Sequence, residues 1–258
     1  MATALRTSNP VLSDRVFGGD WRTGVPAPAR ESAMSLEGTA TKTGILLALV
    51  TAAAWFTWQR VLLPGEGGFA AVMPWAIGSA IAALVVAIAI CFRANWSPFL
   101  APLYALLEGV FLGAISAAFE VRFPGIVPQA VMLTFGTLGG LLIAYRTGII
   151  KATENFKLGV FAATAGIGLV YLVGWILSFF GTGIPLIHGS GPIGIAFSVF
   201  VVVIAALNLV LDFDFIERGV QRGAPRYMEW YAAFGLLVTL VWLYLEILRL
   251  LSKLQSRR

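Results

Sequence analysis

Residues 192–215 read PIGIAFSVFVVVIAALNLVLDFDF, and no charged side chain occurs before Asp212. About 20 consecutive apolar residues form a helix long enough to cross a hydrocarbon core that is roughly 30 Å thick. Only helices and closed barrels satisfy every backbone hydrogen bond inside a bilayer. This stretch therefore predicts a transmembrane helix.

The same pattern occurs in six other parts of the chain. The connections between these apolar runs are short and polar or rich in Gly and Pro, so we expect no separate soluble domain. The predicted fold is all-α, a polytopic seven-helix transmembrane bundle within residues 42–258. The predicted membrane-spanning runs are approximately 43–63, 70–92, 98–119, 126–145, 158–180, 192–215 and 230–251.

Composition supports a lipid environment. Of the 258 residues, 59% are apolar and only 12% are charged, and the mean hydropathy is +0.86. Soluble domains carry roughly a quarter charged residues. The net charge of +5 does not indicate nucleic acid, because the Lys and Arg lie between the apolar runs, where topology-setting charges are found. We expect the lipid bilayer to be a partner and nucleic acid not to be one.

Residues 1–41 are predicted to be a disordered arm, because they are polar and contain Pro, Gly and scattered Arg without a helical apolar period. They lack the charged and apolar regions of a signal peptide. Lys and Arg are most frequent in this arm, between Arg146 and Lys157, and between Arg218 and Arg226. The positive-inside rule then predicts a cytoplasmic N-terminus and an external C-terminus. The basic residues at the C-terminus disagree with this assignment, and the alternative is that the last run enters the membrane and returns to the same side.

Known enzyme sites are hard to build from these residues. His188 is the only histidine and Cys91 the only cysteine, which excludes a two-histidine metal site and a disulfide within the chain. The sequence HGSG at 188–191 resembles a serine protease motif only superficially, because the histidine lies two residues from the serine. There is no phosphate-binding loop of the G-x-x-x-x-G-K-[ST] type. We expect no enzymatic activity, no cofactor and no dedicated metal site.

Acidic residues inside membrane runs are candidate functional residues because burying a charge in lipid is unfavourable. Asp214 lies four residues before Arg218, and Glu246 lies three residues before Arg249, so each could form a local ion pair. Asp212 lies one turn deeper than the membrane interface and forms a short polar stripe with Asn208.

Asp212 and Glu108 leave more than one interpretation open. A desolvated carboxylate such as Asp212 could change charge near neutral pH, which suggests a role linked to protons or cations. The alternative for Asp212 is a buried ion pair between helices. Glu108 lies near the middle of the third run and has no evident partner within its own helix. It could serve function or form an interhelical hydrogen bond.

Two pairs of small residues predict close helix packing. Gly109 and Gly113 form a GxxxG motif in the third run, and Ala162 and Gly166 repeat the spacing in the fifth. Small residues at this spacing allow transmembrane helices to approach closely. We therefore expect a packing role at both places.

Several segments of the chain are distinctive. The most specific are NLVLDFDFIE at 208–217, GAPRYMEWY at 223–231 and LYLEILR at 243–249. Two others are APLYALLEGVFLG at 101–113 and SNPVL at 8–12. Together these segments resemble the bacterial Bax inhibitor-1-like (YccA-type, TMBIM) membrane proteins. The similarity covers nearly the whole chain.

This resemblance implies a seven-helix bundle with the last helix central. It also implies a pH-sensitive calcium leak, in which a carboxylate of the sixth helix shares a proton with an aspartate of the seventh. Asp212 matches the first of these groups, but residues 236–239 contain no acid to match the second. Asp214, Glu108 and Glu246 are the carboxylates that could replace it.

Two functions are consistent with these observations. The leading hypothesis is a slow, pH-modulated calcium or cation leak in the bacterial inner membrane, with Asp212 at its cytoplasmic mouth. Calcium prefers several oxygen ligands, and Asp212, Asp214, Asn208 and Glu108 could supply some of them as a weak contact. The second hypothesis is a stress-response regulator that conducts no ions and binds other membrane proteins or a membrane protease.

Overall fold

The computed structural model describes residues 33–62, 68–180 and 189–257. Within these residues seven helices are long and apolar enough to cross a membrane, which confirms the predicted all-α, seven-helix membrane fold. The helices are α2 (Leu36–Leu62), α3 (Gly68–Phe92), α4 (Ser97–Arg122), α5 (Ile126–Arg146), α6 (Glu154–Phe179), α8 (Pro192–Gln221) and α9 (Met228–Gln255), with a short 3₁₀ turn, η3 (Ala94–Trp96), before α4.

Several helices extend beyond the apolar runs. α2 starts at Leu36, so residues 36–41, which composition assigned to the arm, form its first turns. Ser35 caps this start, because the amide of Gly38 donates to its hydroxyl over 2.9 Å. Thr39 and Thr43 are accommodated because each hydroxyl donates to a carbonyl one turn earlier. Residues 1–32 of the predicted arm lie outside the described residues.

The chain forms two compact units. Among the described residues, one unit comprises those within 125–214 and 239–257, and the other comprises those within 33–124 and 215–238. α8 and α9 each contribute residues to both units. The first of these units is called the α5–α6 unit below, and the second the α2–α4 unit.

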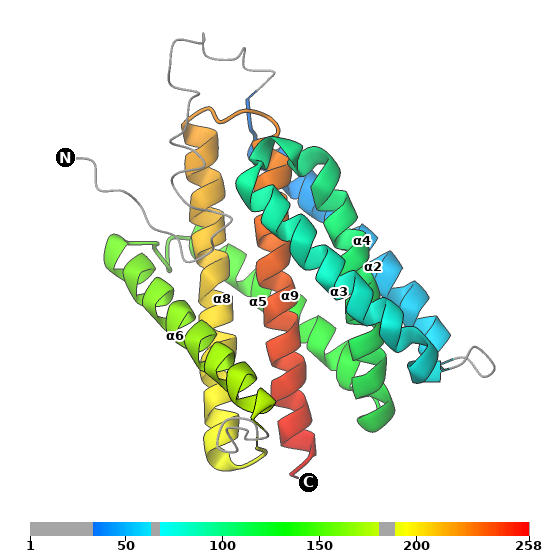
Figure 1. Ribbon diagram of the computed structural model, residues 1–258. Helices are drawn as coiled ribbons and strands as arrows, with labels where there is room; N and C mark the ends of the chain where they lie inside the picture. Colours follow the sequence, from blue (N-terminus) through cyan, green and yellow to red (C-terminus); the bar gives the residue numbers. More distant parts are fainter. Residues whose placement is uncertain (1–32, 63–67, 181–188, 258) are drawn as a thin grey trace. The chain divides into compact units, whose positions relative to one another are not determined.

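The α2–α4 unit is held together by close backbone contact. α2, α3 and α4 run side by side (Figure 1). A Cβ atom added at Gly109 or Gly113 would overlap the backbone of α2 at Val50 and Ala54, respectively. The predicted packing role of this GxxxG motif is therefore confirmed.

The same spacing in α6 has a different outcome. No described atom beyond its own helix lies within 4 Å of the position that a Cβ would occupy at Gly166. The expectation that Ala162 and Gly166 allow a close helix approach is therefore wrong for Gly166. Small residues permit such an approach, but they do not determine which helix face has a neighbour.

The α5–α6 unit has an apolar cluster between α6, α8 and α9. Ile167, Val201 and Ile204 are its buried members, and the side chains of Phe197 and Trp242 pack against them. Figure 1 shows α6 inclined to α8 and crossing it within this unit. Among the seven spans, α9 has the largest buried share, 61% of its apolar window. The central position expected of this helix stays a prediction.

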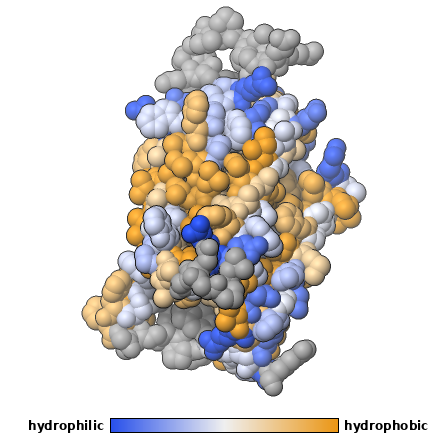
Figure 2. Space-filling view, turned by 90° about the vertical axis from the view of Figure 1, so that its right-hand side faces the viewer, coloured by the Kyte–Doolittle hydropathy of each residue, from blue (hydrophilic) through white to orange (hydrophobic). Residues whose placement is uncertain are grey.

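Exposed apolar side chains cover the helices in the manner required by a lipid solvent. Figure 2 shows a broad apolar patch on the face in view. Exposed residues in the described helices include Trp75, Ile81, Leu172 and Trp175, each at least 50% exposed. Soluble domains rarely expose extensive apolar surface, and in a bilayer these side chains contact acyl chains.

Candidate functional site

One face of α6 carries polar side chains at a regular interval. Lys157, Thr164 and Tyr171 are seven residues apart, which is close to two helical turns, so they align on a single stripe. Each side chain contacts a polar side chain on α8 or α9 of the same unit. The stripe spans about 21 Å at 1.5 Å per residue.

The first contact is an ion pair between α6 and α8. The Lys157 ammonium lies 3.2 Å from a carboxylate oxygen of Asp214 and 3.1 Å from that of Glu154. The Lys157 side chain is only 8% exposed, and that of Asp214 is 18% exposed. Helical spacing predicts a local pair of Asp214 with Arg218, and the structure adds Lys157, a partner on another helix.

The second contact lies one to two turns further along α8. The side-chain amide of Asn208 donates to the hydroxyl of Thr164 over 2.9 Å and to the carbonyl of Ile204 over 2.8 Å. Asn208 and Asp212 are both buried, at 4% and 1% exposure. The predicted polar stripe of these two residues therefore lies inside the protein rather than on its lipid face.

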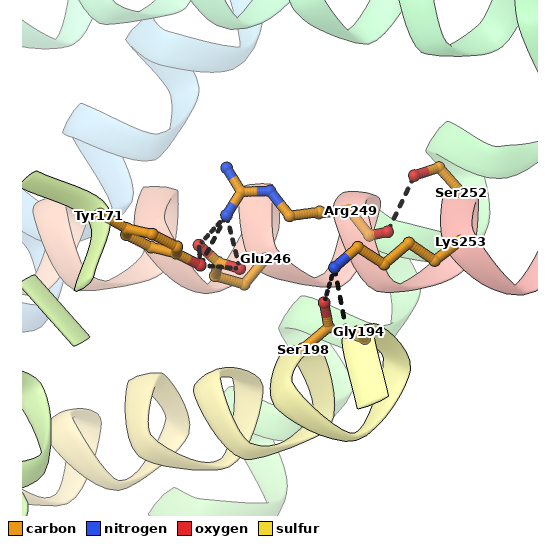
Figure 3. A network of polar contacts seen from close by, with 7 residues as sticks. All are labelled: Tyr171, Gly194, Ser198, Glu246, Arg249, Ser252 and Lys253. Carbon is orange, nitrogen blue, oxygen red and sulfur yellow. Dashed lines mark hydrogen bonds and ion pairs between the residues drawn. The ribbon is translucent and has the colours of Figure 1, made fainter. Parts of the chain in front are cut away.

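The third contact joins α6 to α9. The Tyr171 hydroxyl donates to the Glu246 carboxylate at 3.0 and 3.1 Å, and Arg249 donates to that hydroxyl over 2.6 Å and to the carboxylate over 2.9 Å. Figure 3 shows the three side chains converging. The predicted local pair of Glu246 with Arg249 is confirmed. The contribution of Tyr171 was not predicted.

Lys253 continues the polar groups of α9 beyond Glu246. Its ammonium donates to the carbonyl of Gly194 over 3.0 Å and to the hydroxyl of Ser198 over 2.8 Å, both on α8 (Figure 3). Lys253 is buried, at 6% exposure, and it is not among the candidate residues that the sequence predicts. The seven-residue spacing of Thr239, Glu246 and Lys253 is the signal that could have revealed it.

We call these residues of the α5–α6 unit the polar seam: Lys157, Thr164, Tyr171, Ser198, Asn208, Asp212, Asp214, Glu246, Arg249 and Lys253. It holds three carboxylates together with three cations, so its formal charges balance when all are ionised. Carboxylate, amide and hydroxyl oxygens are also groups that can replace the water around a cation. Chemically, the seam provides hydrophilic groups along helices whose other faces are apolar.

Glu108 belongs to the α2–α4 unit rather than to the unit that contains the seam. It lies half-buried on α4, where it forms a hydrogen bond with the Tyr104 side chain. Tyr104 is four residues earlier on the same helix, a spacing that brings side chains together. The expectation that Glu108 has no partner within its own helix is therefore wrong.

A second polar cluster in the α2–α4 unit was not predicted. Glu229, at the start of α9, accepts hydrogen bonds from the amide and hydroxyl of Ser35, both over 2.9 Å, and pairs with Lys42 of α2. The amide of Met34 donates to the carbonyl of Ala224 over 2.7 Å. These contacts fasten the start of α2 to the connection between α8 and α9.

The described residues contain no group of three or more His, Cys, Asp or Glu side chains that could hold a metal ion. Asp212 and Asp214 are two residues apart on α8 and therefore point in different directions. The weak calcium contact expected at Asp212 would need oxygen atoms from other elements or from water.

Comparison with known proteins agrees with the fold and with the quoted motifs. The family model described as Bax inhibitor 1 like matches residues 9–256, nearly the whole chain. The chain belongs to the Bax inhibitor 1-like family. No curated protein and no solved structure gives a match.

The polar seam lies within the part of the chain that matches the family. The match includes every helix that carries the seam, and it includes the α2–α4 unit with the Glu229 cluster. The chain is thus a multi-pass integral membrane protein of the Bax inhibitor 1-like family. A shared fold does not by itself assign a function, so the site has to be argued from its residues.

Proposed function

We propose that this chain is a slow, pH-modulated leak for calcium or other cations in the bacterial inner membrane. The polar seam carries the proposal. A stripe of hydrophilic side chains inside a membrane protein typically marks a route for ions or protons. Here the stripe extends over two α6 intervals of seven residues and is continued on α8 and α9.

In this proposal, the arrangement described above is the closed form of the leak. Asp214 is paired with Lys157, and Glu246 is paired with Arg249. A carboxylate held by a neighbouring cation is less available to a passing cation. Opening would then require that these pairs separate and that water enters between α6, α8 and α9.

Asp212 is the residue that we propose to link conduction to pH. It lies between Asn208 and Asp214 along α8 and is 1% exposed. When ionised it would attract cations to the seam, and when protonated it would not. Conduction should therefore increase as the pH rises through the range in which Asp212 loses its proton.

We further propose how the chain is oriented in the membrane, and that it has no enzymatic activity. The N-terminus faces the cytoplasm and the C-terminus the outside, because Lys and Arg are concentrated on the proposed inner segments. In this proposal the protein has no enzymatic activity. Calcium would bind weakly during passage, with Asp212 as one contact and no dedicated metal site.

A second function is favoured by one specific observation. The acids whose ion pairs are described above, Asp214, Glu229 and Glu246, are bonded to cations of the same chain. Such pairing suits a regulator that conducts nothing and binds other membrane proteins or a membrane protease through its helix faces. A seam that never opens would serve stability alone.

Flux measurements separate the two proposals. The purified chain is reconstituted into liposomes that contain a calcium indicator, and calcium entry is followed after calcium is added outside. Thr164→Val, which removes the hydroxyl that Asn208 contacts, should change the flux per folded protein. Thr134→Val is the matched control, because the buried Thr134 hydroxyl donates only to Ala130 of its own helix in the contacts described. Absence of flux above empty liposomes would favour the regulator.

A further inference from the structure

The connection between α5 and α6 has a defined backbone conformation. Gly148 has a positive φ of 73°, a left-handed conformation that glycine adopts readily. The amide of Gly148 donates to the carbonyl of Tyr145 over 3.0 Å, and that of Ile150 donates to Ala144 over 3.2 Å. These bonds close the end of α5 and turn the chain sharply before α6 begins.

This turn exposes an apolar side chain where helices more often bury one. After a left-handed glycine at a helix end, the following apolar residue commonly packs back against the last turn. Ile149 instead is 79% exposed. Because the turn is fixed by backbone bonds, Ile149 is presented by a defined backbone and not by a loose loop.

Basic side chains flank this isoleucine on both sides. Arg146 ends α5, and Lys151 follows the turn, and both are exposed. The nearest acid along the chain, Glu154, is bonded to Lys157. The turn therefore presents two cations around one apolar side chain, at the end of a membrane-spanning helix.

We propose that this turn, residues 146–151, is a binding site for the headgroup of an anionic phospholipid. The end of a spanning helix lies at the level of the lipid headgroups. There Ile149 can enter the acyl region while Arg146 and Lys151 contact the phosphate. Basic residues at this level attract anionic lipids, and Arg offers several donors to a phosphate. A zwitterionic headgroup would gain less from the two cations.

Native mass spectrometry of the full chain in mild detergent tests this proposal. The probes are phosphatidylglycerol and phosphatidylcholine with identical acyl chains, supplied together in equal amounts. The wild type should retain phosphatidylglycerol in preference. Each cation contributes a factor of roughly five in affinity, so Arg146→Gln with Lys151→Gln should weaken phosphatidylglycerol binding about 25-fold.

Three further variants make the result specific. Arg122→Gln with Arg257→Gln removes two exposed cations elsewhere and should leave the lipid preference unchanged. Arg146→Lys with Lys151→Arg retains both charges and should remain close to the wild type. Ile149→Ser should weaken retention of both lipids while the preference for phosphatidylglycerol persists. Circular dichroism establishes that each variant is folded.

Three outcomes would overturn the proposal. The first is an unchanged preference in the folded Arg146→Gln, Lys151→Gln protein. The second is an equal loss of preference in the Arg122→Gln, Arg257→Gln protein. The third is displacement of phosphatidylglycerol by an equal concentration of glycerol phosphate, which would assign the site to a free phosphate group. The proposal expects no such displacement, because glycerol phosphate lacks the acyl chains that Ile149 contacts.

Discussion

Lys157 at the start of α6 and Asp214 near the end of α8 form an ion pair with an N–O distance of 3.2 Å. The two residues are 57 positions apart in the sequence, so this pair links two different membrane helices. Lys157 also contacts Glu154 at 3.1 Å, but the Glu154 side chain is 63% exposed. The Asp214 side chain is less exposed, at 18%, so we expect it to account for most of the coupling.

Substitution of either member of this pair should lower the free energy of unfolding. Lys157→Gln leaves Asp214 without its ammonium partner and should lower the free energy of unfolding by about 2 kcal/mol. A double-mutant cycle with Asp214→Asn, measured by thermal unfolding in detergent, should give a coupling of about 1 kcal/mol. Glu154→Gln serves as the control and should change stability by less than about 0.5 kcal/mol. Additive effects of Lys157→Gln and Asp214→Asn would show that the pair is not coupled.

The Tyr171 hydroxyl should stabilise the Glu246–Arg249 pair. Tyr171→Phe removes only the hydroxyl. It keeps the ring in its edge-to-face contact with Phe197, where the ring centroids are 6.2 Å apart. We expect a loss of about 1 kcal/mol in unfolding free energy. When Glu246 is already Gln and Arg249 is already Leu, the same substitution should have a much smaller effect. A full effect in that background would assign the loss to packing of the ring.

Packing between α2 and α4 should depend on Gly113. Its added Cβ would overlap the carbonyl oxygen of Ala54, which is backbone and cannot rotate away. Gly113→Ala should therefore lower the free energy of unfolding by about 1–3 kcal/mol, the usual range for overpacking. Gly139→Ala is the matched control, because no described atom beyond its own helix lies near its Cβ position. Equal thermal midpoints for the two variants would contradict this packing.

Orientation can be measured with reporter fusions. A reporter fused after Lys157 should be cytoplasmic, and one inserted at His188, which lies outside the described residues, should be external. The prediction follows from the distribution of Lys and Arg between the spans. An external signal after Lys157 or a cytoplasmic signal at His188 would reverse the proposed orientation.

Local sequence signals were sufficient to predict the helices. Each span is long and apolar, which leaves few structural alternatives in a bilayer. Helix ends were less accurate: α2 starts at Leu36 and α8 continues to Gln221, because polar residues at the membrane interface can extend a helix. Apolar periodicity does not mark the polar ends of a helix. A capping residue such as Ser35 is the local signal that marks the start of α2.

The candidate site was predictable only where its contacts are local. Glu246 and Arg249 are three residues apart on one helix, so their pair follows from helical spacing. The contacts of Thr164 with Asn208 and of Lys253 with Ser198 depend on which helices are neighbours. Apolar periodicity does not specify that choice, because lipid-facing and protein-facing surfaces in a membrane are similarly apolar.

Calcium flux into proteoliposomes across a pH series, with wild type and Asp212→Asn compared per folded molecule, tests the proposed leak most directly. We predict that wild-type flux increases with pH as Asp212 becomes ionised, and that the flux of Asp212→Asn is nearly independent of pH. Asp214→Asn should retain the pH response of the wild type. If Asp212→Asn sharply lowers the thermal midpoint while its flux and pH profile remain those of the wild type, Asp212 is a structural residue and the proposed pH-modulated leak is contradicted.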